Sequence, residues 1–372
     1  MRVLIAPDKF KGCLTAVGVA EALQLGLLDE RPGLDVTVLP VADGGDGTVD
    51  AALRAGYSEC VVDASGPTGQ PLRTAYALAG DRAVIELAAV VGLDLLPDGR
   101  LDPLGATTYG LGLVIKDAIA RGATEIVLGL GGSASTDGGA GLAQALGARL
   151  LDASGADLPP GGGALAGLAK VDLAPLRATL GTTRIIVATD VDNPLLGPNG
   201  AAAVFGPQKG ASPADVATLD AALANWSRVV SGTIGRDEAT RPGAGAAGGA
   251  GYAALALLNA SIHPGIELIL ALIDFEARLP GADLVITGEG SLDEQSLAGK
   301  APIGVARAAG TAGVPVVAVA GRSLLSPLRL AQAGIAAAYP LSDLEPDPQQ
   351  SIANAAPLLR QVGRRIAKEW LP

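Results

Sequence analysis

The feature that most constrains this chain is a repeated pattern in which a short apolar run ends in a glycine-rich polar loop. Runs such as 2–5, 283–287 and 314–319 are rich in Val, Ile and Leu, and each has the length of a strand buried on both faces. Apolar residues at helical spacing separate these runs, for example in the segment that begins near Thr15. Alternating strands and helices predict an α/β fold with parallel strands.

Composition and charge narrow the class further. Hydrophobic residues make up 49% of the chain but aromatic residues only 3%, so the interior must be packed mainly from aliphatic side chains. A net charge of −11 repels phosphodiester backbones and anionic lipid surfaces, so we expect neither a nucleic-acid nor a membrane partner. The only cysteines are Cys13 and Cys60, and the first apolar run is too short for a signal peptide, which favours a cytoplasmic protein. The sequence leaves a homodimer open.

A length of 372 residues predicts two domains. Strands expected at both ends of the chain would form a five-stranded sheet of flavodoxin-like type. Residues 1–65 and 280–372 would then form one discontinuous domain, and residues 66–279 would form an inserted α/β domain. The inserted segment has its own expected strands at 125–128 and 184–188, and a helix that begins at Pro213 with Ser212 as its cap.

Several loops concentrate glycine with charged or hydroxyl residues, and most of them directly follow an expected strand, where open α/β sheets bind ligands. The richest is GLGGSASTDGGAG at 129–141. Its glycines let backbone amides wrap a phosphate, and its hydroxyls donate further hydrogen bonds. We predict a phosphate-binding site from this loop and a second glycine-rich segment, formed by Gly131, Gly132, Ser133, Asp137, Gly245, Gly248 and Gly249.

The other loops carry the charges that phosphoryl transfer needs. Asp190, at the end of an expected strand, is the first candidate for the base that accepts a hydroxyl proton, with Asp43 and Asp46 as alternatives. Lys9 and Lys209 are candidates to offset phosphate charge. The metal ligand stays unassigned between Asp190 and Asp46. Predicted substrate contacts are Asp8, Lys11, Asp43, Asp46, Glu289, Asp293, Gln295 and Lys300.

Two other classes of function are open at this point. Gly129, Gly131 and Ala134 fit a G-x-G-x-x-A dinucleotide fingerprint, which would indicate an NAD(P)-dependent oxidoreductase of a small hydroxy acid. The polar insert at 133–139 argues against this reading because it delays the helix that the fingerprint requires. A non-catalytic, acid-sensing module is the third reading, but the loops keep their acids and lysines. The sequence has neither a G-x-x-x-x-G-K-[ST] loop nor a protein-kinase signature, so an ATP site would be of another type.

Seven blocks, in order along the chain, carry a family resemblance: APDKFKG, VADGGDGT, GLGGSASTDGGAG, TDVDNPLLGPNGA, FGPQKGA, PGAGAAGGAG and TGEGSLDEQSLAGKAPIGVA. With these blocks the sequence resembles the bacterial type I glycerate kinases along essentially its whole length. The resemblance implies ATP-dependent phosphorylation of glycerate at a cleft between two domains, with Mg²⁺ as helper ion and 2-phosphoglycerate as the usual product. Ser291 departs from the pattern, because many members carry Arg there, and this puts one anion contact in doubt. Cys13 also departs, where a small hydroxyl residue is common.

Overall fold

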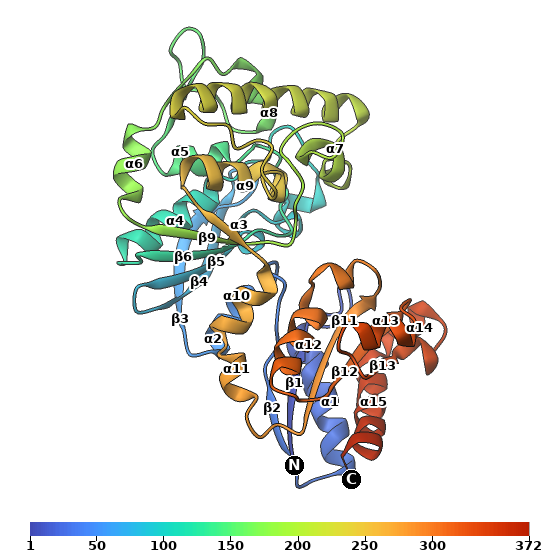
Figure 1. Cartoon of the computed structure of the whole chain (residues 1–372). Helices are drawn as coiled ribbons and strands as arrows, with labels where there is room; N and C mark the ends of the chain where they lie inside the picture. The colour runs from blue at the N-terminus through green and yellow to red at the C-terminus, as the bar shows by residue number, and fades with distance from the viewer. Residues whose placement is uncertain (372) are drawn as a thin grey trace. The chain divides into compact units, whose positions relative to one another are not determined.

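The computed structural model describes residues 1–371 and divides the chain into two compact units (Figure 1). The first unit contains 1–43, 50–55 and the chain from 264 onward, and the second contains 44–49 and 56–263. The sequence placed the domain boundaries at 65 and 280 instead. The strand Ser58–Ser65 pairs with the strand that follows it, so it belongs to the second unit.

The first unit is built on a five-stranded parallel sheet in the order β2-β1-β11-β12-β13. This confirms the flavodoxin-like sheet expected from the two ends of the chain. The strands are β1 (Arg2–Pro7), β2 (Asp35–Val38), β11 (Leu284–Leu292), β12 (Val316–Ser323) and β13 (Ala337–Pro340). One local expectation was wrong: the strand expected at 283–287 is longer, because β11 continues to Leu292 in register with β12.

Two helices from opposite ends of the chain lie side by side in this unit, α1 (Ala16–Glu30) and α15 (Ala355–Trp370), as Figure 1 shows. They meet at Gly26 and Gly363. A Cβ atom added at Gly26 would lie 2.1 Å from the carbonyl oxygen of Arg360, so only glycine permits this approach. Their apolar faces cover the sheet with a core built from the two helices and from β1, β11 and β12.

The remaining helices of the first unit are α10 (Gly265–Leu272), α11 (Phe275–Arg278), α12 (Ala301–Thr311), α13 (Pro327–Gln332) and α14 (Pro348–Ala353). Of these, α12 packs against β11 and β12. Helix α2 (Thr48–Arg54) contains residues of both units.

The second unit has a six-stranded sheet in the order β10-β9-β6-β5-β4-β3. Four strands are parallel, and β4 and β3 continue the sheet as an antiparallel hairpin. The strands expected at 125–128 and 184–188 are confirmed as β6 and β9. The strands are β3 (Ser58–Ser65), β4 (Pro71–Ala79), β5 (Arg82–Glu86), β6 (Glu125–Gly129), β9 (Arg184–Ala188) and β10 (Ser261–His263), beside the separate pair β7 (Arg149–Leu151) and β8 (Lys170–Asp172).

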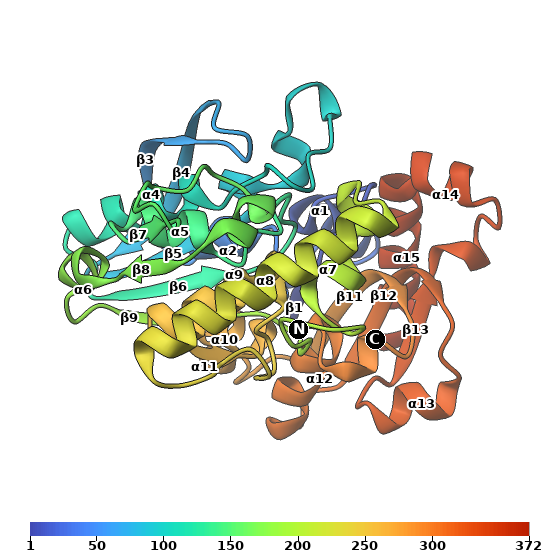
Figure 2. The ribbon, with the colours of Figure 1, turned by 90° about the horizontal axis from the view of Figure 1, so that it is seen from above.

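Helix α8 (Pro213–Ile234) runs across the second unit (Figure 2). Ser212 caps it as expected: its Oγ accepts from the amide of Asp215 at 3.2 Å, and the Asp215 carboxylate accepts from the amide of Ser212 at 2.9 Å. The face of α8 that carries Leu223 and Trp226 is buried in the core. The other helices are α3 (Ala88–Val91), α4 (Tyr109–Ala120), α5 (Ala140–Ala145), α6 (Ala174–Leu180), α7 (Ala201–Phe205) and α9 (Ala246–Leu257).

Short 3₁₀ turns complete the chain: η1 (Leu93–Leu95), η2 (Pro97–Gly99), η3 (Gly162–Gly167), η4 (Pro207–Lys209), η5 (Ser296–Ala298) and η6 (Leu341–Asp343). Within residues 1–371, no helix combines the length and the apolar character needed to cross a membrane. His263 ends β10, and its side chain is exposed, with Nε2 3.1 Å from the hydroxyl oxygen of Ser261.

Candidate active site

The glycine-rich loop 129–141 lies at the carboxyl end of β6 in the second unit and leads into α5. Among residues 1–371, no acceptor is found for the backbone amides of Gly131, Gly132, Ser133, Ser135 and Thr136. The hydroxyl oxygens of Ser135 and Thr136 are buried and also lack a hydrogen-bond partner there. Buried polar groups are almost always paired in folded proteins. A loop with this many unused donors therefore fits an anionic ligand.

Lys209 reaches this loop from η4. Its side chain is 2% exposed, and its Nζ donates to the hydroxyl of Ser133 at 2.7 Å and to the carbonyl of Ser135 at 2.5 Å. Burial lowers the pKa of Lys209 to about 7, while the charge of Asp137 acts in the opposite direction. The ammonium is thus fixed against the loop, with little solvent to screen it. The structure brings Lys209 and Ser133 together, two residues that the sequence had assigned to phosphate binding separately.

Asp137 is fully buried and holds the loop in shape from inside. Its Oδ2 accepts from the amide of Thr108 at 2.7 Å, the hydroxyl of Thr108 at 2.9 Å, the hydroxyl of Thr107 at 3.2 Å and the amide of Gly141 at 3.1 Å. Its Oδ1 accepts from the amide of Gly139 at 3.1 Å. These contacts favour a positioning role over the direct phosphate contact that was predicted. The two threonines, which no sequence motif marked, belong to the same support.

The second glycine-rich segment, at 243–249, packs against the first. The carbonyl of Gly248 accepts from the amide of Gly138 at 3.0 Å, and the amide of Gly245 donates to the backbone carbonyl of Asn193 at 2.8 Å. A Cβ atom added at Gly248 would lie 2.0 Å from the carbonyl oxygen of Ser135, and one at Gly249 would lie 2.8 Å from Cα of Gly138. Phosphate binding by Gly245, Gly248 and Gly249 stays a prediction. Close packing of the two backbones is by itself a sufficient reason for glycine at Gly248 and Gly249, because a side chain there would clash with the first loop.

Residues 44–49 place a carboxylate beside the loop 129–141. A Cβ atom added at Gly131 would lie 2.8 Å from Cα of Gly45, and one at Gly132 would lie 3.1 Å from Oδ1 of Asp46. Glu86, at the end of β5, accepts from the amides of Gly47 at 3.0 Å and Val49 at 3.3 Å. Glu86 was not singled out from the sequence, because a single acid at the end of a strand has no motif around it.

Asp190 follows β9, the strand next to β6 in the sheet. Gly129 of β6 pairs with Ala188 of β9, and the amide of Leu130 donates to the carbonyl of Ala188 at 3.1 Å. The exposed Asp190 and the loop 129–141 therefore start from neighbouring strand ends of one sheet. Its assignment as the base stays a prediction.

In the first unit, three acids meet at the carboxyl end of the sheet: Asp8 after β1, Asp43 after β2, and Glu289 on β11. Asp8 and Glu289 are each 8% exposed. Burial, with the charges of Asp43 and Glu289, raises the pKa of Asp8 to about 7 against the opposing charge of Lys9. Burial also raises the pKa of Glu289, and one of its carboxylate oxygens is buried without a partner among residues 1–371. The three acids were predicted as substrate contacts from separate loops.

The other predicted substrate residues of this unit differ in their surroundings. Asp293 accepts from the amides of Gln295 at 2.9 Å and Ser296 at 3.4 Å, so its carboxylate shapes the turn that follows β11. Gln295 and Lys11 are exposed, whereas Lys300 is half-buried at the start of α12. These substrate contacts, and that of Lys9, stay predictions.

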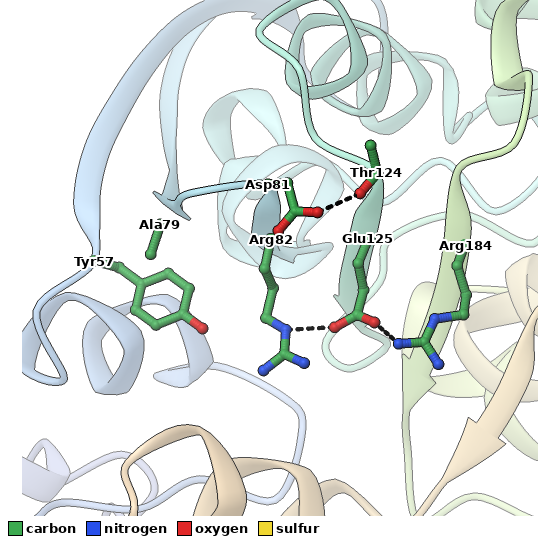
Figure 3. A pocket seen from close by; sticks show the side chains of 7 residues that line it. All are labelled: Tyr57, Ala79, Asp81, Arg82, Thr124, Glu125 and Arg184. Carbon is green, nitrogen blue, oxygen red and sulfur yellow. Dashed lines mark hydrogen bonds and ion pairs between the residues drawn. The ribbon is translucent and has the colours of Figure 1, made fainter.

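A separate pocket of about 470 Å³ lies at the opposite edge of the second sheet, around the first residues of β5, β6 and β9 (Figure 3). There Glu125 forms ion pairs with both Arg82 and Arg184, and Asp81 accepts from the hydroxyl of Thr124 at 2.6 Å. Two arginines face two acids, so the pocket offers no excess charge to an anion. None of the predicted site residues lines it.

Comparison with known proteins agrees with the sequence blocks. Residues 3–371 match the family model described as "Glycerate kinase family". The "Glycerate kinase" of Bacillus subtilis is 43% identical over 370 residues, 99% of this chain and 97% of that protein. The "Glycerate 2-kinase" of Escherichia coli is 44% identical over 324 residues, 86% of this chain and 85% of that protein.

The fold comparison gives the same result. A crystal structure from Salmonella typhimurium LT2 is 41% identical and superposes with a TM-score of 0.84, covering 99% of this chain and 97% of that one. A match over the whole length, in sequence and in fold, establishes the family. The chain therefore belongs to the glycerate kinase family, a family of phosphotransferases.

Proposed function

We propose that this protein transfers the terminal phosphoryl group of ATP to glycerate and releases 2-phosphoglycerate. The observation that carries the proposal is the loop 129–141, whose unused amide donors stand beside the buried ammonium of Lys209. The names of the relatives supply the substrate, and the name of the Escherichia coli relative supplies the position of the new phosphate.

The donor side of the reaction belongs to the second unit. Amides around Gly131, Gly132 and Ser133 would hold the phosphates, and Lys209 would offset the charge that develops during transfer. Positioning the phosphates in advance lowers the barrier to transfer, because no solvent has to rearrange around them during the reaction. The fully buried Asp137 would keep these donors in position.

The residues present also fit a magnesium ion. Within residues 1–371, no group of three or more His, Cys, Asp or Glu side chains is placed to hold a metal. Mg²⁺ with a nucleotide needs less, because it usually takes one or two carboxylates together with phosphate oxygens and water. Asp46, beside Gly132, would supply such a carboxylate. When bound, the ion would neutralise phosphate charge.

The acceptor side belongs to the first unit. Asp8, Asp43 and Glu289 offer carboxyl groups for the hydroxyls of glycerate. Asp190, at its strand end in the second unit, would accept the proton of the attacking hydroxyl. In-line transfer requires that the donor and acceptor residues meet during turnover, as the predicted cleft between domains would allow.

A coupled assay of ADP release tests the proposal with glycerate, glycolate, lactate and tartronate as acceptors. We expect turnover with glycerate, and ³¹P and ¹H spectra of the product should show phosphate on the hydroxyl at carbon 2. No ADP release with any of these acids would refute the proposal. Titration of NADH fluorescence tests the oxidoreductase alternative, which is disfavoured because α5 begins only at Ala140, well after the fingerprint glycines.

A further inference from the structure

Strands β11 and β12 extend beyond their neighbours at the carboxyl edge of the first sheet. β1 pairs with β11 only as far as Gly288, and β13 pairs with β12 only as far as Ala320. The pairing of β11 with β12 continues past both, to Ser291 opposite Arg322 and beyond. The two strands therefore project as a short ribbon at the edge where open α/β sheets bind their ligands.

Arg322 is on β12, and its side chain contacts Ser291 on β11. Its Nε donates to the hydroxyl of Ser291 at 3.1 Å, and that hydroxyl lies 3.4 Å from the carboxylate of Asp293. The side chain of Arg322 is exposed, and its guanidinium forms no ion pair with any residue from 1 to 371. Ser291 thus fixes one nitrogen, and the two terminal nitrogens remain available to bind a carboxylate in a fork.

The orientation of Arg322 follows from the strand register. Residues paired across a sheet point to the same face, and so do residues two positions apart on one strand. Glu289 and Ser291 therefore share a face, and Arg322 shares it with them. Glu289 belongs to the acidic cluster with Asp8 and Asp43. This cluster can bind hydroxyls, but it repels a carboxylate unless a cation stands on the same face.

We infer that Arg322 binds the carboxylate of the substrate, while Asp8 and Glu289 bind hydroxyl groups of the same molecule. The inference rests on the proposed function, because glycerate supplies both kinds of group. A guanidinium suits this contact better than the ammonium groups of Lys11 and Lys300, the lysines predicted as substrate contacts, since its planar fork matches a carboxylate.

The same geometry bears on the serine at position 291. Residues 291 and 322 are paired neighbours, so an arginine at either position would present its charge at the same edge of the sheet. Arg322 then replaces the anion contact that the departure at Ser291 left in doubt. The two positions are predicted to be interchangeable carriers of one positive charge.

Steady-state kinetics of Arg322→Ser test the inference. A lost charged hydrogen bond should raise the KM for glycerate about 10- to 100-fold. The KM for ATP and the turnover number should change less than about 3-fold, because the contact is with an unreacting group of the substrate. Arg322→Gln, which keeps a polar side chain without the charge, serves as a second variant if Arg322→Ser melts at a lower temperature than the parent.

Two further variants separate carboxylate binding from a general loss of charge. The exchange Ser291→Arg with Arg322→Ser should recover most of the lost affinity for glycerate. Arg329→Ser is the matched control, because that guanidinium already pairs with Glu294 at 2.6 Å, and its KM for glycerate should stay unchanged.

The outcomes are distinguishable. If the parent enzyme phosphorylates glycerate but Arg322→Ser and Arg322→Gln keep the parental KM, the inference is overturned and the proposed function stands. An exchange variant as impaired as Arg322→Ser, or an equal loss in Arg329→Ser, also overturns it. If the parent consumes no ATP with glycerate, the proposed function itself fails, and the inference fails with it.

Discussion

The ammonium nitrogen of Lys209 lies 2.7 Å from the hydroxyl oxygen of Ser133, although the two residues are 76 positions apart in the chain. The contact joins a buried cation to a loop in which five backbone amides, those of Gly131, Gly132, Ser133, Ser135 and Thr136, have no acceptor among the described residues. Buried lysines are costly unless something offsets the desolvation. A bound phosphate would supply that compensation, which gives the pair a functional reason.

Replacement of Lys209 by Met keeps most of the length of the side chain and removes its charge. We expect turnover to fall at least about 100-fold, because on the proposed mechanism the transferring group would lose a buried cation that offsets its charge. Thermal melting should change little, since an apolar side chain replaces a desolvated ammonium. The coupled ADP assay measures the first effect, and normal turnover would remove Lys209 from the mechanism.

Asp190→Asn tests the predicted base. An amide cannot accept the hydroxyl proton, so turnover should fall by orders of magnitude, whereas the dissociation constant for ATP should stay within about 3-fold of the parental value. Single-turnover kinetics and equilibrium binding measure the two quantities. Asp192→Asn, two residues further along the same segment, is the control. Near-normal turnover in Asp190→Asn would return the role to Asp43 or Asp46.

A matched pair of glycines separates packing from phosphate binding. Gly248→Ala should destabilise the protein by several kcal/mol, because the new Cβ would lie 2.0 Å from the Ser135 carbonyl oxygen at a φ of +68°. Gly132→Ala has a similar φ of +66° but an exposed backbone, so it should cost only about 1 kcal/mol while raising the KM for ATP. Urea unfolding and ATP kinetics measure both. The assignment fails if Gly132→Ala leaves the KM for ATP unchanged.

Asp137→Asn should destabilise the second unit by about 2–4 kcal/mol. The amide group places donors where the carboxylate accepts from Thr108, Thr107, Gly139 and Gly141, so buried donors lose their partner. Asp63→Asn, at an exposed position on β3 of the same unit, is the control. Calorimetry measures the change, and an unaltered melting temperature would contradict the positioning role.

Asp8 gives the protein a specific pH dependence of stability. Its pKa rises from 3.8 to about 7 on folding, so the folded state binds a proton that the unfolded state releases between these values. The favourable contribution is complete below pH 3.8 and is lost as pH rises through 7. Asp8→Asn should therefore match the parent at pH 4 and exceed its stability at pH 8, by on the order of 4 kcal/mol at most. Urea unfolding at the two pH values measures the difference; the same difference at both would exclude this shift.

Much of the fold could be read from the sequence, because parallel strands buried on both faces produce continuous apolar runs. The runs that became β1, β11 and β12 indicated the α/β class and the five-stranded sheet, and the runs that became β6 and β9 indicated the strands of the inserted segment. The β3–β4 hairpin was not predicted, because it lies at the edge of its sheet and its residues alternate in exposure instead of forming a continuous apolar run. The strand expected at 283–287 is shorter than β11 because the glycines at 288 and 290 resemble a turn, yet the segment as far as Leu292 pairs with β12.

The sequence by itself determined the fold class, the family and the loops that carry chemistry, since local glycine, charge and hydrophobic patterns encode all three. Only the tertiary structure decided what each polar group faces. In the folded protein Asp137 and Gly248 are buried. Lys209 contacts Ser133, and Arg322 contacts Ser291. These pairings depend on strand order and register, which bring together residues far apart in the chain, and no local pattern records which partner will be met.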